Sequence, residues 1–528
     1  MGVDLSNIPV DRDHDMPATA AGIPPEKASA ILSQFSRRRR AAAIAVPTDD
    51  GRVRARLREF GQPITLFGED STDRRDRLRE LLTDLEEQKE AAGVAAGEEG
   101  EDVSMKEEEE EEAEEEGEEE FYTEGGSELL EARKRIARYS IPRAKARIER
   151  QKEESTIPLR THIKHRKAIK EKLQNFDLYG SQIAGDRPVS IARFAPDGQI
   201  LAAGNWGGGI KLLNVPNLEE KITLRGHTDR VGGISWFPGA TKPEANVSES
   251  SVNLASGGGE GNVHLWSLNQ DTPVTTLSGH SGRVCRVEFH PSGDYLASAS
   301  YDTTWRLWDV ATSTELLLQE GHSREVYSLA FNLDGSLLAS GGLDSYGRIW
   351  DLRTGRTVMI LEGHIREIYG LDWGADGYRV LSASGDGWVK CWDIRQVRCT
   401  GGVGAHRGVV SDLRWYKGTE TASSYLPSVP LQDQNGSAID SPATPSAPVL
   451  DQSPAAPSQP VQPKKSGTFF VSSGFDKNVN VFSADDWSLV KSLSGHSGNV
   501  LSVDVSDDVK WIASCGHDRT VKLWGIDV

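Results

Sequence analysis

Residues 279–310 read GHSGRVCRVEFHPSGDYLASASYDTTWRLWDV, and residues 321–352 follow the same pattern as GHSREVYSLAFNLDGSLLASGGLDSYGRIWDL. A Gly-His pair opens each stretch and a Trp-Asp pair closes it, with the Trp 28 residues after the His. The same step of 42 residues leads onward to His364 and then to His406. Because self-similarity at a fixed period is typical of folds assembled from repeated units, this pattern predicts a repeat protein.

The repeat extends in both directions to seven units. His227 and His496 open further copies. In the copies that lack a regular Trp-Asp pair, the Trp position is held by Leu213, Trp266, Phe482 and Trp524. Two intervals are longer than the period because they contain insertions, one at 239–251 and one at 418–466 that is rich in Pro, Ser, Gln and Asp.

This double pattern resembles the WD-repeat family, in which each unit supplies four strands. The resemblance implies a mainly β fold: a C-terminal seven-bladed WD-repeat β-propeller over residues 180–528, with a disordered insertion at 418–466. A single unit would leave its sheet edges and apolar faces exposed, so stacking the units around an axis is favoured. The residues before the propeller are expected to form an α-helical, partly disordered arm.

Composition changes sharply near residue 180. All 13 Trp residues lie beyond it, and the formal net charge of −19 comes mostly from residues 98–120, of which 16 are acidic. No apolar stretch approaches the roughly 20 residues of a membrane span, and the four Cys residues show no metal-binding spacing. We predict a flexible N-terminus with a short helix, a helical hairpin, an acidic disordered linker, a basic helical segment and the propeller, at 1–45, 46–90, 91–124, 125–179 and 180–528.

Each regular unit also repeats a Ser and an acidic residue before its Trp. Together with the His these resemble Ser-His-Asp triads, but a catalytic set is needed once, whereas a hydrogen-bond network that ties loops to a strand can recur in every blade. We therefore expect no catalytic residue, no cofactor and no metal site, and the alternative is a hydrolase that uses one set. The predicted structural network comprises His280, Ser298, Asp302, Trp308, His322, Ser340, Asp344, Trp350, His364, Ser382, Asp386 and Trp392.

A basic residue frequently follows the Gly-His pair, and aromatic residues recur nearby. If the blades stack as proposed, these side chains gather on one face of the disc, where Arg and aromatic residues commonly anchor partners. The alternative is that each Arg pairs with a neighbouring acid or is simply solvated. The expected partner-binding residues are Arg230, Arg283, Arg324, Arg366, Arg407, Tyr327 and Tyr369, supported by Tyr301, Trp305, Tyr346 and Trp388.

Residues 46–90 predict two short helices around a turn. Val53, Leu57 and Phe60 form the apolar side of the first helix, which Gly61 and Pro63 end. The apolar stripe of the second helix consists of Leu78, Leu81, Leu82 and Leu85. So short a hairpin buries little by itself, and we expect it to dock onto another surface.

The turn of this hairpin reads Gly61-Gln-Pro-Ile-Thr-Leu-Phe-Gly-Glu69 and closely resembles a splicing-factor motif. Joined to a C-terminal propeller, it resembles the WD-repeat proteins of the U4/U6 small nuclear ribonucleoprotein, the pre-mRNA-processing factor four family. The resemblance implies a nuclear, non-enzymatic scaffold of the U4/U6 snRNP and the U4/U6·U5 tri-snRNP that acts in spliceosome assembly and pre-mRNA splicing. It implies as partners pre-mRNA-processing factor three, a spliceosomal cyclophilin, other tri-snRNP proteins and U4/U6 snRNA, and no membrane. An adaptor that presents substrates to a ubiquitin ligase is the alternative function.

Residues 128–172 carry 15 Lys and Arg residues against six acidic ones. Leu129, Ala132, Ile136 and Tyr139 mark one helical face, Pro142 is expected to start a second helix, and residues 159–173 are expected to form a third. Such basic helices could follow RNA phosphates, bind an acidic protein or pair with the acidic segment of this chain. The expected partner- or RNA-binding residues of the arm are Arg54, Arg58, Ile64, Leu66, Phe67, Arg133, Arg135, Arg138, Arg143, Lys145 and Arg147.

Overall fold

A computed structural model describes residues 46, 50–60, 62–63, 73–79, 81–83, 125–245, 247–418 and 466–526. Several predictions from the sequence lie outside these residues: the N-terminal helix, the acidic linker, the insertion between 418 and 466, and Ile64, Leu66 and Phe67. Every helix among the described residues is too short or too polar to span a membrane.

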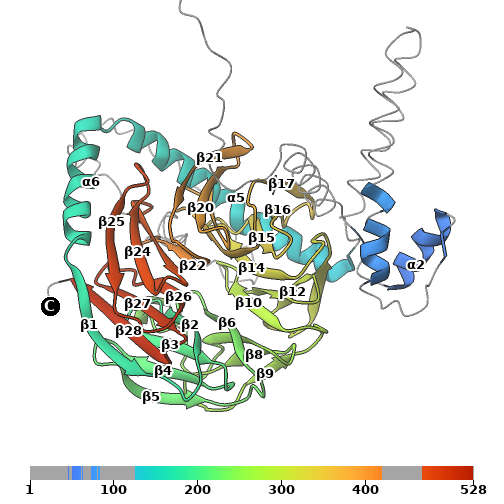
Figure 1. Cartoon of the computed structure of the whole chain (residues 1–528), viewed down its shortest axis with the longest axis horizontal. Coiled ribbons are helices and arrows are strands. Elements are labelled where there is room, and N and C mark those ends of the chain that lie inside the picture. Colours follow the sequence, from blue (N-terminus) through green and yellow to red (C-terminus); the bar gives the residue numbers. More distant parts are fainter. Residues whose placement is uncertain are drawn as a thin grey trace, which may run out of the picture.

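Seven four-stranded antiparallel sheets surround a central axis, as the sequence predicted (Figure 1). In six of the sheets the first strand along the chain is innermost, and the innermost strands of all seven sheets contact one another in a closed circle. We number the sheets as blades 1 to 7 in chain order. Blade 1 consists of β2 (Val189–Phe194), β3 (Ile200–Asn205), β4 (Ile210–Asn214) and β5 (Glu219–Leu224). Blade 2 consists of β6 (Val231–Trp236), β7 (Leu254–Gly258), β8 (Val263–Trp266) and β9 (Thr275–Leu277). Blade 3 consists of β10 (Val284–Phe289), β11 (Tyr295–Ser300), β12 (Trp305–Asp309) and β13 (Glu315–Gln319).

The insertion in blade 2 includes a short 3₁₀ helix, η2 (Pro243–Ala245). Blades 4 to 6 repeat the same arrangement of four strands. Blade 4 consists of β14 (Val326–Phe331), β15 (Leu337–Gly342), β16 (Gly347–Asp351) and β17 (Thr357–Leu361). Blade 5 consists of β18 (Ile368–Trp373), β19 (Arg379–Ser384), β20 (Trp388–Asp393) and β21 (Arg398–Gly404). Blade 6 consists of β22 (Val410–Trp415), β23 (Phe469–Gly474), β24 (Asn478–Ser483) and β25 (Leu489–Ser494).

Blade 7 closes the ring with strands from both ends of the propeller. Its inner three strands are β26 (Val500–Val505), β27 (Trp511–Gly516) and β28 (Thr520–Ile526), and its outermost strand is β1 (Phe176–Ile183). β1 pairs antiparallel with β28 from Phe176 opposite Ile526 to Ile183 opposite Thr520. This pairing satisfies the backbone N–H and C=O groups at the outer edge of β28 and joins the start of the propeller to its last blade.

The sequence pattern explains why the blades pack. Inward-facing apolar side chains fill the spaces between neighbouring sheets, and the large ones include Trp266, Trp308, Trp350 and Trp524, all of them buried. Every innermost strand has a register shift directly after its first residue, for example between Val284 and Arg286. A bulge increases local twist, so its repetition suits seven strongly twisted blades around an axis.

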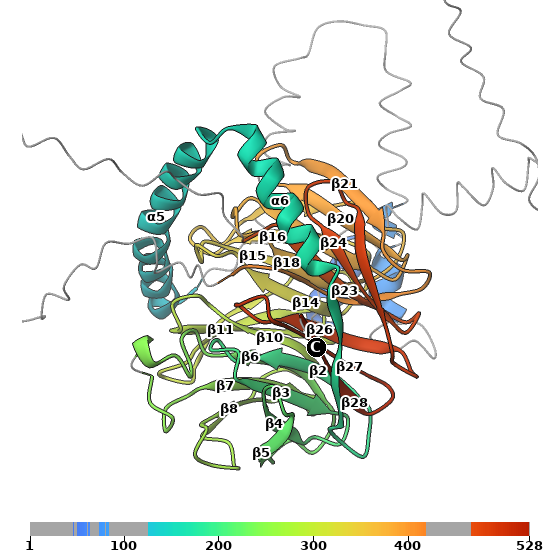
Figure 2. The same cartoon turned by 90° about the vertical axis from the view of Figure 1, so that its left-hand side faces the viewer.

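Two long helices precede the propeller and lie against it (Figure 2). α5 (Ser127–Ser155) crosses one face, and α6 (Leu159–Leu173) runs along the rim to β1. The prediction that Pro142 starts a separate helix is wrong, because Pro142 lies inside the continuous α5. A proline inside a helix removes one backbone hydrogen bond. Ile136 and Ser140 before Pro142 are buried against the propeller, and Arg147 after it pairs with Asp334 of the propeller. These contacts keep α5 continuous on both sides of the proline.

Helical residues lie on both sides of the predicted turn of the N-terminal hairpin, whereas Leu85 of the predicted stripe lies outside the described residues. α2 (Asp50–Glu59) packs against helical residues 73–79 and 81–83. Val46, Val53, Leu57 and Leu78 form its small buried core. Phe60 departs from the prediction because it lies at the end of the helix and is 38% exposed, so it does not belong to the buried stripe.

Candidate partner-binding surfaces

A buried hydrogen-bond network recurs in blades 2 to 7. In blade 3, His280 Nδ1 lies 2.7 Å from Asp302 Oδ2, and His280 Nε2 lies 2.7 Å from Ser298 Oγ. The Trp308 indole donates to the same Ser298 hydroxyl at 2.8 Å. Burial raises the pKa of Asp302, but the hydrogen bond and the charge of His280 outweigh this effect and lower it to about 2. Since the hydroxyl is fully buried and already holds two partners, the geometry supports a structural role.

The same network is found in the neighbouring blades with small variations. His322 contacts Asp344 and Ser340, and His364 contacts Asp386 and Ser382, all between 2.6 and 3.0 Å. Trp350 and Trp392 donate to Ser340 and Ser382. Blades 6 and 7 repeat the set with His406, Asp476 and Ser472 and with His496, Asp518, Ser514 and Trp524; Phe482 takes the Trp position of blade 6.

Replacing Ser340 by alanine should lower the free energy of unfolding by about 1–3 kcal/mol, because His322 and Trp350 each lose their buried hydrogen-bond partner. Urea unfolding of the purified chain measures this loss. Ser492→Ala, on an exposed position of β25, is the matched control and should change stability by less than about 0.5 kcal/mol. Equal stability of the two variants would contradict the structural role.

The central channel holds a network of charged residues that was not predicted from the sequence. At the fifth position of the innermost strands lie Arg193, Glu288, Asp372, Arg414 and Asp504, although these strands are otherwise mainly apolar. They line a cavity of about 230 Å³ on the axis together with Lys417. A charged residue at the same position in five of the seven innermost strands is the sequence signal that could have indicated this network.

Asp412 is the centre of this channel network. Its carboxylate contacts Arg193 at 2.8 Å, Arg286 at 3.1 Å and the Ser502 hydroxyl at 2.7 Å, so it links blades 1, 3, 6 and 7. Burial raises its pKa, but the two guanidinium groups outweigh burial and hold the pKa well below its usual range. The residues around the cavity are therefore of both signs, with Arg193, Arg414 and Lys417 beside Glu288, Asp372, Asp504 and Asp507. Burial raises the pKa values of Glu288 and Asp504.

The predicted surface arginines lie in the loops that lead into the innermost strands. Gly259 N–H donates to the Arg230 carbonyl, and Tyr301 N–H donates to the Arg283 carbonyl, so these loops share a face with the turns between second and third strands. Counted from the preceding His, Arg230 and Arg283 stand third, whereas the remaining three stand second or first: Arg324, Arg366 and Arg407. The five side chains thus start from three different loop positions.

Only some of the predicted aromatic residues lie on this face. The Arg283 guanidinium lies 4.2 Å from the Tyr301 ring centre, and Tyr327 and Tyr369 meet edge to face at 5.1 Å. Trp388 is 49% exposed. The prediction was wrong for Trp305 and Tyr346, which are buried because they pack in the blade interiors.

The opposite face carries α5. Leu129, Ala132 and Ile136 are buried against blades 3 and 4, as the helical periodicity predicted. Tyr139 donates to the Pro291 carbonyl at 2.9 Å, in the turn between the first two strands of blade 3. Arg147 forms a 2.7 Å ion pair with Asp334 in the equivalent turn of blade 4 and donates to the Asp376 carbonyl of blade 5.

These contacts divide the predicted arm residues into two groups. Arg147 is engaged with the propeller, Arg133 lies against Gly355, and Arg143 folds over the Tyr139 ring at 3.5 Å. Arg135, Arg138 and Lys145 are exposed, as are Arg54 and Arg58 of α2. The exposed side of α5 forms a band that we call the outer stripe: Leu130, Lys134, Arg138, Ile141, Lys145, Ile148 and Lys152.

The hairpin and α6 are also held by polar contacts. Arg75 and Arg79 both donate to the Ser323 carbonyl, at 2.7 and 2.9 Å, next to Arg324. In α6, Arg166 pairs with Asp485 at 2.7 Å and Lys170 with Asp486 at 2.9 Å. The expectation that the hairpin docks onto another surface is therefore met by the propeller itself.

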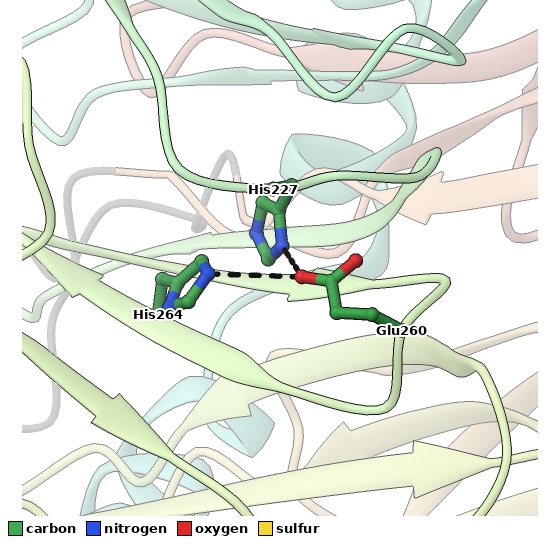
Figure 3. A group of neighbouring side chains, drawn as sticks. All are labelled: His227, Glu260 and His264. Atoms are coloured by element: carbon green, nitrogen blue, oxygen red, sulfur yellow. Dashed lines mark hydrogen bonds and ion pairs between the residues drawn. The ribbon is translucent and has the colours of Figure 1, made fainter.

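Blade 2 contains a variant of the network with an additional imidazole. His227, Glu260 and His264 form a group of the kind that can hold a metal ion, with ligand atoms all within 4.8 Å of one another (Figure 3). Burial, and next the neighbouring His227, lower the pKa of His264 to about 4, so this imidazole is neutral at neutral pH.

Known proteins resemble this chain in both of its parts. Residues 53–81 match the family described as pre-mRNA processing factor 4 (PRP4) like. The family described as WD domain, G-beta repeat matches residues 218–267, 271–309, 313–351, 355–393 and 487–525.

Three relatives show how far the similarity extends. The U4/U6 small nuclear ribonucleoprotein PRP4 of Saccharomyces cerevisiae is 36% identical over 98% of both chains. A WD repeat-containing protein of Schizosaccharomyces pombe is 40% identical over 52% of this chain, and the U4/U6 small nuclear ribonucleoprotein Prp4 of Homo sapiens is 38% identical over 41%. The aligned parts cover 56% and 40% of these last two proteins, about half of their length.

Proposed function

Because this chain belongs to the family of U4/U6 small nuclear ribonucleoprotein Prp4 proteins, we propose that it is a subunit of a U4/U6 snRNP and of the U4/U6·U5 tri-snRNP in the nucleus. In this role it is a non-enzymatic scaffold for spliceosome assembly and pre-mRNA splicing. Pre-mRNA-processing factor three, a spliceosomal cyclophilin and further tri-snRNP proteins are the proposed partners. Similarity to the yeast protein over nearly the whole chain is the observation that carries this proposal.

The outer stripe of α5 is the part of the arm best suited to a partner. Its seven residues fall within a narrow sector of one helix, because residues 11 and 7 positions apart return almost to the same angle. Leu130, Ile141 and Ile148 are 52%, 57% and 45% exposed, and four cations lie among them. Contacts to RNA phosphates require only the cations. The exposed Leu and Ile side chains therefore favour a partner protein whose surface has an apolar groove bordered by acidic residues.

The propeller supports this role by fixing the helix. Arg147, Tyr139 and the buried apolar face hold α5 on three blades, so the outer stripe is presented without a further ordering cost on binding. The loops around Arg230 and Arg283 on the opposite face offer a second partner surface. One rigid body thereby presents two separate faces, as a scaffold requires.

Reversing the charge of Lys134, Arg138 and Lys145 to Glu should abolish recovery of partner proteins, because an acidic groove would then meet three like charges. The measurement is affinity purification of the tagged full-length chain from nuclear extract, with proteins identified and RNA sequenced, with and without ribonuclease. U4, U6 and U5 RNAs should accompany the unmodified chain.

Lys221, Arg225 and Arg398, exposed near the rim of blades 1 and 5, provide a control with the same change of charge. Their reversal should leave recovery intact. If the outer-stripe variant loses the RNAs but retains all the partner proteins, the outer stripe binds RNA and not a protein. Absence of these RNAs from the unmodified chain, when the snRNP itself is intact, would overturn the spliceosomal function.

A further inference from the structure

Three potential metal ligands converge in blade 2 (Figure 3). His227 lies in the loop before β6, Glu260 in the turn between β7 and β8, and His264 on β8. His227 Nδ1 contacts Glu260 Oε1, and His264 Nε2 lies 3.6 Å from the same oxygen. His227 stands 33 residues before Glu260, so no short sequence motif indicates this group.

Two departures from the other blades create the group. The acidic residue of the network is Glu260, where blades 3 to 7 have Asp, and the longer side chain reaches toward β8. The residue two positions before the Trp is His264, where blades 3, 4, 5 and 7 have a cation. The corresponding residues are Arg306, Arg348, Lys390 and Lys522.

These departures leave a carboxylate oxygen without its usual partner. In blade 4, Asp344 Oδ1 accepts the Tyr346 backbone N–H at 3.1 Å, and Asp302 Oδ1 accepts the Thr304 N–H in blade 3. Glu260 Oε2 is buried and has no hydrogen-bond partner in the described part of the chain. A buried carboxylate oxygen with no partner is costly, and a cation would satisfy it.

We propose that His227, Glu260 and His264 bind a divalent transition-metal ion, for which Zn²⁺ is the best match. Two imidazole nitrogens and one carboxylate oxygen form a donor set that Zn²⁺ uses, with bonds of about 2.0–2.2 Å. Tetrahedral geometry places such donors about 3.3 Å apart, within reach of small side-chain shifts from the observed spacing. Water completes the coordination.

The surrounding hydroxyl groups are placed to orient both imidazoles. His227 Nε2 lies 2.6 Å from Ser256 Oγ, and His264 Nδ1 lies 2.9 Å from Thr276 Oγ1. If each of these nitrogens carries the proton and donates it to the hydroxyl, His227 Nδ1 and His264 Nε2 present free lone pairs to the metal. The ion would then join the loop before β6 to β8, which is a structural role independent of the proposed function.

Titration of Zn²⁺ into chelator-treated full-length chain by isothermal calorimetry tests the site. The unmodified chain should bind one Zn²⁺ that His264→Arg weakens at least about tenfold. Arginine occupies this position in blades 3 and 4, so the variant should retain the fold. Glu260→Asp restores the carboxylate of the other blades and should also weaken binding. His517→Asn, which removes an exposed imidazole elsewhere, is the control and should not change the affinity.

A converse experiment guards against a loss caused by misfolding. The double variant Asp302→Glu with Arg306→His introduces both departures into blade 3 and should add a second equivalent of bound Zn²⁺. Titration with Co²⁺ should give the visible spectrum of a four-coordinate site in the unmodified chain and lose it in His264→Arg. Equal binding by the unmodified chain and His264→Arg, or no saturable Zn²⁺ binding, would overturn the proposal.

Discussion

Replacing Asp412 by asparagine should lower the free energy of unfolding by about 3–5 kcal/mol, because the buried Arg193 and Arg286 would both lose the carboxylate that they contact. Asparagine has nearly the same shape, so the loss would report the charge rather than a cavity. Urea unfolding monitored by Trp fluorescence measures it. Asp177→Asn breaks the exposed pair with Lys491 and should cost less than about 1 kcal/mol. Equal effects of the two substitutions would contradict a central role for Asp412.

The destabilisation by Asp412→Asn should also depend on pH. The pKa of the Asp412 carboxyl is lower in the folded chain than the value of about 3.9 for an unfolded Asp. The carboxylate therefore contributes its full stability above about pH 4, and this contribution is lost as the pH falls toward the folded pKa. The difference between Asp412→Asn and the unmodified chain should shrink in acid. A constant difference from pH 7 to pH 3 would argue against the ion pairs as its cause.

Removal of β1 should destabilise the propeller by more than about 4 kcal/mol. The backbone of β28 would lose its antiparallel partner, and the buried Phe176 would leave the core of blades 6 and 7. Burial of a Phe side chain alone contributes about 1.5–3 kcal/mol, and each of the several lost hydrogen bonds adds about 0.5–1.5 kcal/mol. The comparison is between fragments 175–528 and 185–528, measured by urea unfolding and size-exclusion chromatography.

The two fragments share every blade except for the closing strand. Fragment 175–528 lacks α5 and α6 but keeps β1, so it separates closure of the ring from docking of the arm. We expect it to remain folded and monomeric, whereas 185–528 should unfold earlier and associate through the exposed edge of β28. Similar unfolding midpoints for both fragments would show that the ring does not depend on closure by β1.

The charged residues in the channel couple the blades to one another, so substitutions there affect more than one blade. Blades 1, 3, 5, 6 and 7 each contribute charged residues to this network, so a substitution in one blade removes a contact of another blade. The repeated His–Ser–Asp–Trp networks behave differently, because each is confined to one blade and its entering loop. Stability of individual blades and cohesion between blades thus rest on separate sets of polar contacts.

Much of this architecture could be predicted from the sequence. The Gly-His and Trp-Asp spacing determined seven units of four strands, because each unit carries its own turns, apolar alternation and buried network within about 42 residues. The apolar faces around Leu57, Leu78 and Ile136 were likewise predicted, since helical periodicity alone marks the side that must be buried. Local pattern suffices wherever the partners of a residue are near in sequence or equivalent in every repeat.

Only the tertiary structure decided the contacts between distant or non-equivalent residues. Arg193 and Asp412 lie 219 residues apart, and no periodicity relates a cation in blade 1 to an acid in blade 6. Arg147 and Lys145 are alike in sequence, yet docking on Asp334 buries one and leaves the other exposed. The same docking keeps α5 continuous through Pro142, against its local preference. These features depend on where the ring closes and which helical face the propeller covers, and the chain determines both only once it is folded.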